Sequence, residues 1–266
     1  MRIVSRGMDL GRWLRPLVVA IAMIGVWEAL VALFSIPAWK LPAPSAIAQE
    51  LVDSRSLFLN HTWVTLREVL VGFSVAFTFG VTLAALISAS PTFRRAVYPF
   101  VIGSQTVPII VIAPLLLIWV GYGLAPKVVV ITLIAFFPIV VNTVDGLGAA
   151  DPDMVRMMRT LGATRRQVFL KVRLPAALPF IFSGTKVAIT YSVIGAVIGE
   201  WVGSSEGLGY LTRISVPMFQ TARSFGAVTL LSAMGVGLFV SIALLERRML
   251  PWYFAEHGSD EEAYSN

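Results

Sequence analysis

Long apolar runs separated by short polar segments dominate the pattern of this chain. Six of them approach or exceed the roughly 20 apolar residues that a helix needs to cross the hydrocarbon layer of a membrane. We expect membrane spans at 17–36, 64–88, 99–120, 127–144, 178–201 and 225–245. The pattern predicts an all-α polytopic membrane protein with six transmembrane helices. Pro108, Pro114 and Pro138 should kink their helices, because a proline removes one backbone hydrogen bond.

The first run begins after Arg15 and resembles the apolar region of a signal peptide. It is longer than the about 7–15 residues of such a region, and no A-x-A cleavage site follows it. We therefore expect a retained helix. The chain divides into an N-terminal segment at 1–16, a transmembrane domain at 17–250 and a polar tail at 251–266, of which we expect Glu256 to Asn266 to be disordered.

The composition supports a membrane protein and excludes some kinds of site. Apolar residues make up 57% of the chain, and the mean hydropathy of +0.80 is well above that of soluble domains. There is no cysteine, which excludes disulfides and thiolate-bound metals. His61 and His257 lie far apart without ligand spacing, so we expect no metal site. The net charge of +6 is explained by cationic loops, so no nucleic-acid partner is expected.

The cationic residues are divided unequally between the two sets of loops. The set that includes both chain ends holds fourteen Lys and Arg residues, the opposite set holds six, and Lys186 lies inside a span. Loops rich in Lys and Arg stay in the cytoplasm. We therefore expect both termini, and the long basic loop between the fourth and fifth runs, to be cytoplasmic.

This basic loop predicts two short helices joined by a tight turn. Asp151 suits the cap of the first helix, Pro152 suits its first position, and Gly162 can end it in the left-handed conformation. Its apolar positions fall on one face at helical spacing: Met154, Met157, Met158 and Leu161.

The second helix of the loop should begin at Thr164, which can cap it, and stop at Leu174-Pro175. Its apolar side consists of Val168, Phe169 and Val172. Such a loop suits either a lipid-bound amphipathic helix or a docking element for a soluble partner, and spacing alone does not decide between them.

The loop also contains Gly162, then eleven residues, then Leu174-Pro175. This arrangement resembles the cytoplasmic loop of binding-protein-dependent permeases of ATP-driven importers, which carries Glu-Ala-Ala, then Gly, then Leu-Pro. Four further stretches are similar to that family: Phe136 to Leu147, Pro175 to Trp201, Gln105 to Pro108 and Gly207 to Tyr210. The resemblance covers about Thr65 to Pro251. It is greatest to the branch that moves nitrate, sulfonates, taurine, and thiamine-pyrimidine-like or riboflavin-like nutrients.

The resemblance implies an assembly in the bacterial inner membrane. Two copies of the chain would form the path, two ATP-hydrolysing subunits would dock on the cytoplasmic loops, and an external binding protein would deliver the substrate. We call 151–175 the coupling loop. Its docking residues would be Arg156, Met157, Met158, Arg159, Leu161, Gly162, Ala163, Leu174 and Pro175. The chain has no phosphate-binding G-x-x-x-x-G-K-[ST] motif, so ATP and Mg²⁺ would belong to the partner, and we expect neither a cofactor nor catalysis here.

One departure from the family lies in the coupling loop, where Glu-Ala-Ala falls on Arg156-Met157-Met158. We hypothesise that the two thioether side chains fill an apolar groove on the partner, since methionine adapts to irregular surfaces. Arg156 would then face an acidic group there.

Ionisable residues inside spans usually serve a function. By counting along the helices, Glu28 and Lys186 should lie at similar depth, so we predict that they pair. Glu200 ends the fifth run near the external face, either as a gate or docking residue or as a solvated helix end. For the substrate path, between the third and fifth helices, we select Gln105, Thr106, Pro108, Lys186, Tyr191 and Glu200.

Three other classes of protein remain as alternatives. A self-contained secondary transporter or channel would need an ion site, for which Glu28 and Lys186 are the candidates. A membrane enzyme would need a cluster of His, Asp or Glu, which the sequence lacks. A scaffold would use the basic loop for lipid alone. For the importer, the Gln105–Pro108 stretch resembles vitamin-precursor members more than sulfonate members.

Overall fold

The computed structural model describes residues 10–254, and the side chains of residues 17–254. Within these residues the chain is helical and contains no strand, which confirms the expected all-α fold. The elements are α1 (Leu10–Leu33), α2 (Pro44–Asp53), α3 (Arg55–Ala89), α4 (Pro91–Gly103), η1 (Ser104–Thr106), α5 (Ile109–Val120), α6 (Leu124–Gly148), α7 (Pro152–Thr160), α8 (Arg165–Val168), η2 (Phe169–Arg173), α9 (Leu174–Gly203), α10 (Leu208–Ser215) and α11 (Thr221–Met249).

Most of the predicted spans correspond to long apolar helices. Four helical runs are long and apolar enough to cross a membrane: α3, α6, α11 and the continuous stretch Arg165–Gly203 that ends in α9. The bent pair of α4–η1 and α5 is long and apolar enough only when its two parts are taken together, and α1 carries a shorter apolar part, Leu17–Leu33. The predicted boundaries were too narrow, since α3 alone extends over 35 residues.

The prediction of one kinked helix over 99–120 was wrong. The chain bends by 101° between α4–η1 and α5. Val107 is extended at φ −86° and ψ 119°, as expected for a residue before proline, and Pro108 has no N–H to continue a helix. Pro108 therefore breaks the span into two helices.

The predicted stop at Leu174-Pro175 was also wrong. The chain continues from α8 through the π-helical turn η2 into α9 without leaving helical geometry. The π turn ends at Arg173, two residues before Pro175, whose missing N–H would otherwise leave a gap in the α-helical ladder. The second helix of the coupling loop is thus the beginning of a membrane span.

Close contact between α6 and α9 forms the centre of the fold. A Cβ atom at Gly184 would lie 2.6 Å from the carbonyl oxygen of Pro138, and one at Gly195 would lie 2.9 Å from the Cα of Ile131. These distances are below van der Waals contact, so the two backbones approach as they do because both positions lack a side chain. Small residues allow such packing in membranes, where lipid and protein interiors are equally apolar.

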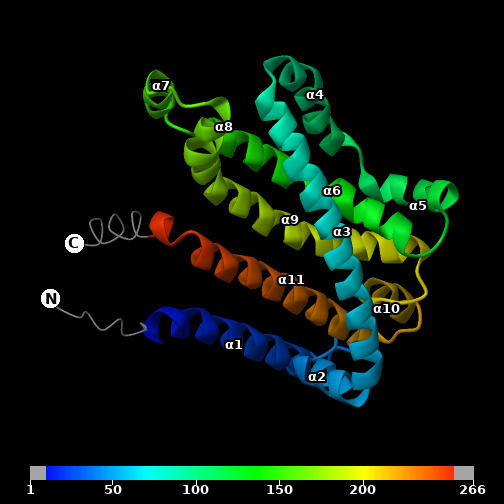
Figure 1. Ribbon diagram of the computed structural model, residues 1–266. Helices are drawn as coiled ribbons and strands as arrows, with labels where there is room; N and C mark the ends of the chain where they lie inside the picture. The colour runs from blue at the N-terminus through cyan, green and yellow to red at the C-terminus, as the bar shows by residue number, and fades with distance from the viewer. Residues whose placement is uncertain (1–9, 255–266) are drawn as a thin grey trace.

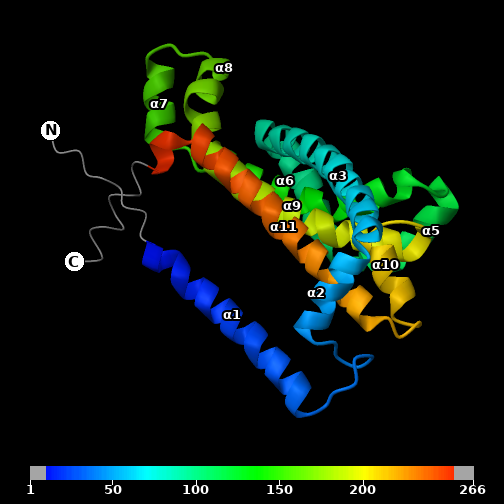
Figure 2. The ribbon, with the colours of Figure 1, turned by 90° about the horizontal axis from the view of Figure 1, so that it is seen from below.

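The long helices place the shorter elements at two opposite ends of the bundle (Figure 1). The coupling loop, the first turn of α1 and the last turn of α11 lie at one end, whereas α2, α5 and α10 lie at the other. α1 stands to one side of the bundle beyond α11 (Figure 2), and among its described side chains Val31 is buried.

We predict that Gly184→Ala lowers the free energy of unfolding by about 1–3 kcal/mol, because the added methyl group must separate α9 from α6. Gly237→Ala is the control, since a Cβ at this exposed position of α11 meets nothing within 4 Å. The control should be neutral or stabilising by up to about 1 kcal/mol. Unfolding of the purified protein in detergent measures both; equal effects would contradict the packing argument.

Candidate functional site

The coupling loop is shaped by its own capping residues. The Asp151 carboxylate accepts a hydrogen bond from the Asp153 N–H at 2.8 Å, and Gly162 turns the chain at φ +81°. Thr164 and Gln167 form a reciprocal capping box, in which the Thr164 N–H donates to Gln167 Oε1 at 2.8 Å. Such caps hold short helices in place. The predicted caps at Asp151 and Thr164 and the left-handed turn at Gly162 are confirmed.

The coupling loop has a small apolar core. Val155 of α7 is buried against Val168 and Val172, and Met158 and Ala163 pack on the same cluster. The hypothesis that Met157 and Met158 together fill a groove on the partner does not suit Met158, because its side chain packs on the core of the loop itself. Because it has this core, the coupling loop is a folded helical hairpin.

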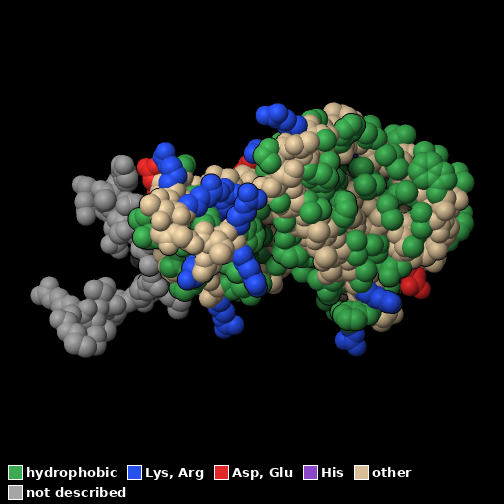
Figure 3. All heavy atoms as spheres, turned by 45° about the horizontal axis from the view of Figure 1, so that its top comes forward, with side chains coloured by type: hydrophobic (Ala, Val, Ile, Leu, Met, Phe, Trp, Pro, Cys, Tyr) green, Lys and Arg blue, Asp and Glu red, His purple; other side chains and the backbone are tan. Residues whose placement is uncertain are grey.

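The outer side of the loop combines apolar and cationic groups. Met154, Met157 and Leu161 are 48%, 56% and 75% exposed. Lys and Arg side chains gather over this end of the molecule (Figure 3). Arg156 forms an ion pair with Asp153 one turn earlier on α7. Its carboxylate partner is therefore present within the same helix, and a partner subunit is not required to supply one.

The residues selected for the substrate path do not form one cluster. Gln105, Thr106 and Pro108 lie in the exposed break between α4 and α5, where the Thr106 hydroxyl donates to the Gly103 carbonyl at 2.8 Å. Tyr191 is 42% exposed on α9. Whether these four residues line one path remains a prediction.

The predicted pair between Glu28 and Lys186 is not formed. Lys186 donates to Glu246 of α11 at 2.7 Å, and Glu28 accepts from the backbone N–H of Ser45 at 3.0 Å and from its hydroxyl at 2.6 Å. α1 begins at Leu10, earlier than expected, so Glu28 lies in its last two turns. There its carboxylate stabilises the first turn of α2, where free N–H groups attract negative charge.

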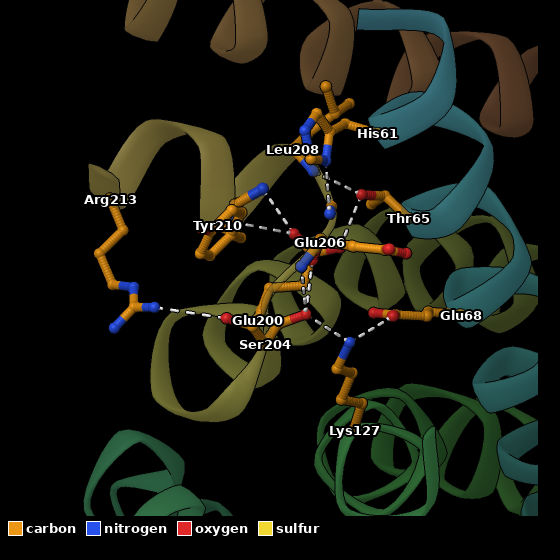
Figure 4. A network of polar contacts seen from close by, with 12 residues as sticks. His61, Thr65, Glu68, Lys127, Glu200, Ser204, Glu206, Leu208, Tyr210 and Arg213 are labelled. Atoms are coloured by element: carbon orange, nitrogen blue, oxygen red, sulfur yellow. Dashed lines mark hydrogen bonds and ion pairs between the residues drawn. The ribbon is translucent and has the colours of Figure 1, made fainter. Parts of the chain in front are cut away.

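Glu200 is neither a solvated helix end nor an exposed gate, since it is 0% exposed. Figure 4 shows it at the centre of a polar network between α3, α9 and α10. The Thr65 hydroxyl donates to Glu200 Oε1 at 2.6 Å, and the N–H groups of Gly209 and Tyr210 donate to Oε2. A Cβ at Gly207 would lie 2.2 Å from the carboxyl carbon of Glu200. The segment between α9 and α10 therefore packs directly on the Glu200 side chain. Glu200 therefore fixes the turn between α9 and α10.

A second part of this network was not predicted. Lys127 of α6 is 7% exposed and donates to Glu68 Oε1 at 2.5 Å and to Ser204 Oγ at 2.7 Å. His61 accepts from the Gly207 N–H at 2.9 Å. The sequence contained a signal, because His61, Thr65 and Glu68 recur at the i, i+4, i+7 spacing of one helix face. That spacing was missed because the second span was taken to begin at Val64.

The network borders an open cleft of about 600 Å³ at the α2–α5–α10 end. Lys127, Ser204 and Arg213 line it with exposed Tyr122. Among residues 10–254, no group of three or more His, Asp or Glu side chains is arranged to hold a metal ion. Because Lys127 is already paired with Glu68, the cleft offers the Arg213 guanidinium and the Tyr122 ring to a ligand or to a protein surface.

The ion pairs predict which two substitutions have non-additive effects on the free energy of unfolding. Lys186→Met and Glu246→Gln should be non-additive by about 0.5–3 kcal/mol in unfolding free energy, because their side chains touch. Glu28→Gln and Lys186→Met should add within about 0.5 kcal/mol, because these residues have different partners. Additive behaviour of the first pair, or coupling of the second, would contradict the observed pairing.

Thr65→Val tests the buried network with little change in shape. The hydroxyl donates to Glu200 and accepts from the Leu208 N–H at 2.8 Å, so its loss should cost about 1–3 kcal/mol of unfolding free energy. Thr229→Val is the matched control, since this exposed hydroxyl donates only to the Phe225 carbonyl of its own helix. A comparison of melting curves that shows equal losses would argue against a stabilising role of the network.

Known proteins of similar sequence are transport permeases. The formylaminopyrimidine transport permease protein of Halalkalibacterium halodurans is 37% identical over 240 residues, which cover 90% of this chain and 96% of the relative. The riboflavin transport system permease protein of Chloroflexus aurantiacus is 34% identical and covers 85% of each chain. A putative aliphatic sulfonates transport permease protein of Bacillus subtilis is 30% identical over 90% of this chain and 88% of its own.

Solved structures support the same fold. A chain of the MetNI methionine ABC transporter in an inward-facing conformation superposes with a TM-score of 0.63 at 23% identity, covering 75% of this chain and 97% of that one. The family described as binding-protein-dependent transport system inner membrane component matches residues 76–251. This chain therefore belongs to the family of inner membrane components of binding-protein-dependent transport systems.

Proposed function

We propose that this chain forms the membrane path of an ATP-driven importer for a small nitrogen heterocycle of the vitamin-precursor class. The single observation that carries the ATP-driven part is the coupling loop. It is a capped hairpin with its own core, and it presents Met154, Met157 and Leu161 outward at the basic end of the bundle. A rigid apolar face of this kind suits a groove on a soluble partner.

The family and the geometry of the described helices support the following assembly. An ATP-hydrolysing subunit, which binds ATP and Mg²⁺, docks on the coupling loop of each of two copies of this chain. The coupling-loop end is cytoplasmic, because it carries the excess of Lys and Arg. The first turn of α1 and the last turn of α11 lie at that same end, which supports the proposal that both termini are on the cytoplasmic side of the bacterial inner membrane. An external binding protein delivers substrate to the α2–α5–α10 end.

The substrate class rests on the relatives and on the charges within the helices. The relatives named for formylaminopyrimidine and riboflavin are 37% and 34% identical, whereas the sulfonate relative is 30% identical. Lys127 of α6 and Lys186 of α9 are each paired with a glutamate. Neither lysine is free to attract a sulfonate, so an uncharged or weakly charged substrate suits the helices better. Gln105, Thr106, Pro108 and Tyr191 are the residues that we place along its path.

Substitution of the outer face of α7 tests the docking role. Leu161→Asp should weaken co-purification of the ATP-hydrolysing subunit about tenfold or more, because it places a charge at the centre of an apolar contact. Gly162→Trp should act in the same direction, since a side chain is strained at φ +81°. Val52→Asp is the control, because Val52 is 67% exposed on α2 at the opposite end.

The first measurement is a pull-down in mild detergent, with mass spectrometry of the proteins retained. Substrate-stimulated ATP hydrolysis is measured next, and the uptake of an aminopyrimidine is compared with the uptake of a sulfonate. Normal hydrolysis and uptake with Leu161→Asp would overturn the docking assignment. Uptake that persists without any ATP-hydrolysing subunit would instead indicate a self-contained transporter. Preferential uptake of the sulfonate would overturn the substrate class alone.

A further inference from the structure

A cavity of about 250 Å³ lies beside the coupling loop, at the opposite end from Glu200. Three separate parts of the chain enclose it: the turn from α3 into α4, the last turn of α6, and the end of η2. Ile87, Val144 and Leu147 give it an apolar wall, and Arg94 and Arg173 line it with cationic groups. The cavity thus joins the surface of a membrane span to the base of the coupling loop.

The two arginines have no carboxylate partner in the described chain. Arg94 lies on α4, with its guanidinium 5.7 Å from the ring centroid of Tyr98, and Arg173 ends η2 and is partly buried. Neither forms an ion pair with any residue between 17 and 254, including the exposed Asp145 on α6. Two guanidinium groups that line one cavity without an ion-pair partner leave their N–H donors available to an anion.

Two further features favour an oxyanion. Ser88 lines the cavity, and its hydroxyl is buried without a hydrogen-bond partner among the described residues. Buried polar groups are rarely left unpaired, so the hydroxyl has an unused capacity to donate. Pro91, the first residue of the 13-residue helix α4, also lines the cavity and brings the positive end of that helix to it.

These features select a ligand by its chemistry. Guanidinium groups match the oxygen geometry of phosphate through paired N–H donors. A water molecule takes up about 30 Å³ in the liquid, so the cavity holds a group several times larger, such as a phosphate with part of a headgroup. The apolar wall, continuous with α3, would contact the glycerol and the first methylenes of a lipid.

We propose that Arg94 and Arg173 bind a phosphate group, supplied either by the headgroup of an anionic phospholipid or by a soluble phosphate. Val172 belongs to the core of the coupling loop, directly before Arg173. A phosphate held by both arginines therefore links the α3–α4 turn to the base of that loop. Binding itself does not depend on the transport function, whereas an effect on ATP hydrolysis rests on the proposed function.

The test uses the full chain in its purified complex, reconstituted in nanodiscs of phosphatidylcholine with or without phosphatidylglycerol. Native mass spectrometry counts retained phosphatidylglycerol, and thermal unfolding reports its binding. We compare Arg94→Gln/Arg173→Gln with the matched control Arg95→Gln/Lys171→Gln. The control removes the same charge from two exposed neighbours that do not line the cavity.

The expected result is that phosphatidylglycerol is retained and stabilises the wild type. Its apparent affinity should fall about tenfold or more in the cavity variant and remain unchanged in the control. Stabilisation of phosphatidylcholine discs by millimolar inorganic phosphate, lost in the same variant, would identify the soluble source. Arg94→Lys/Arg173→Lys keeps the charge but loses the paired donors, so intermediate binding is expected even if the glutamine variant folds poorly.

Three results would overturn the proposal. The first is no response of the wild type to either phosphatidylglycerol or phosphate. The second is an equal loss in the cavity and control variants, which would reflect general surface charge. The third is release of the ATP-hydrolysing subunit from the cavity variant in discs without anionic lipid, which would assign the arginines to that protein. Lipid retention is measured without transport, so failure of the proposed function would be seen separately.

Discussion

The approach of α6 to α9 is the contact on which the rest of the structure depends. Lipid gives no hydrophobic force to hold two apolar helices together, so packing and hydrogen bonds must do so. Gly184 and Gly195 let the backbones meet, and Gly72 of α3 would place a Cβ 2.6 Å from Ile131, on the same helix α6. Three spans are thus brought together at α6.

This close packing also determines where charge is tolerated. Lys127 meets Glu68 and Lys186 meets Glu246, each pair joining two different helices. A charge that lost its partner in these positions would be left in apolar surroundings, which is costly. The pairs therefore favour one relative position of their helices over shifted ones. The two lysines within these helices are thus held in matched contacts, which leaves neither charge free for a substrate.

Local features could be predicted from the sequence, and distant contacts could not. The caps at Asp151 and Thr164 and the turn at Gly162 depend on a few neighbouring residues, so spacing revealed them. Proline behaviour depends on surroundings: Pro138 stays within α6, where its carbonyl accepts from Asn142, whereas Pro108 in an exposed stretch breaks the helix. The partners of Lys186 and Glu200 lie 60 and 135 positions away in the chain, and only the tertiary packing decides them.

The π turn η2 joins the coupling loop to a membrane span without a break in helical geometry, within the run from Arg165 to Gly203. These 39 residues form one continuous helical run of about 58 Å. The core of the coupling loop lies at its beginning, and the Glu200 network lies near its end. If a partner docks on the coupling loop as proposed, a displacement there reaches the far end of the bundle along continuous helix, without passing through a loop. The π turn is the one place in this run where the backbone leaves α-helical geometry, and it lies between the coupling loop and the Glu200 network.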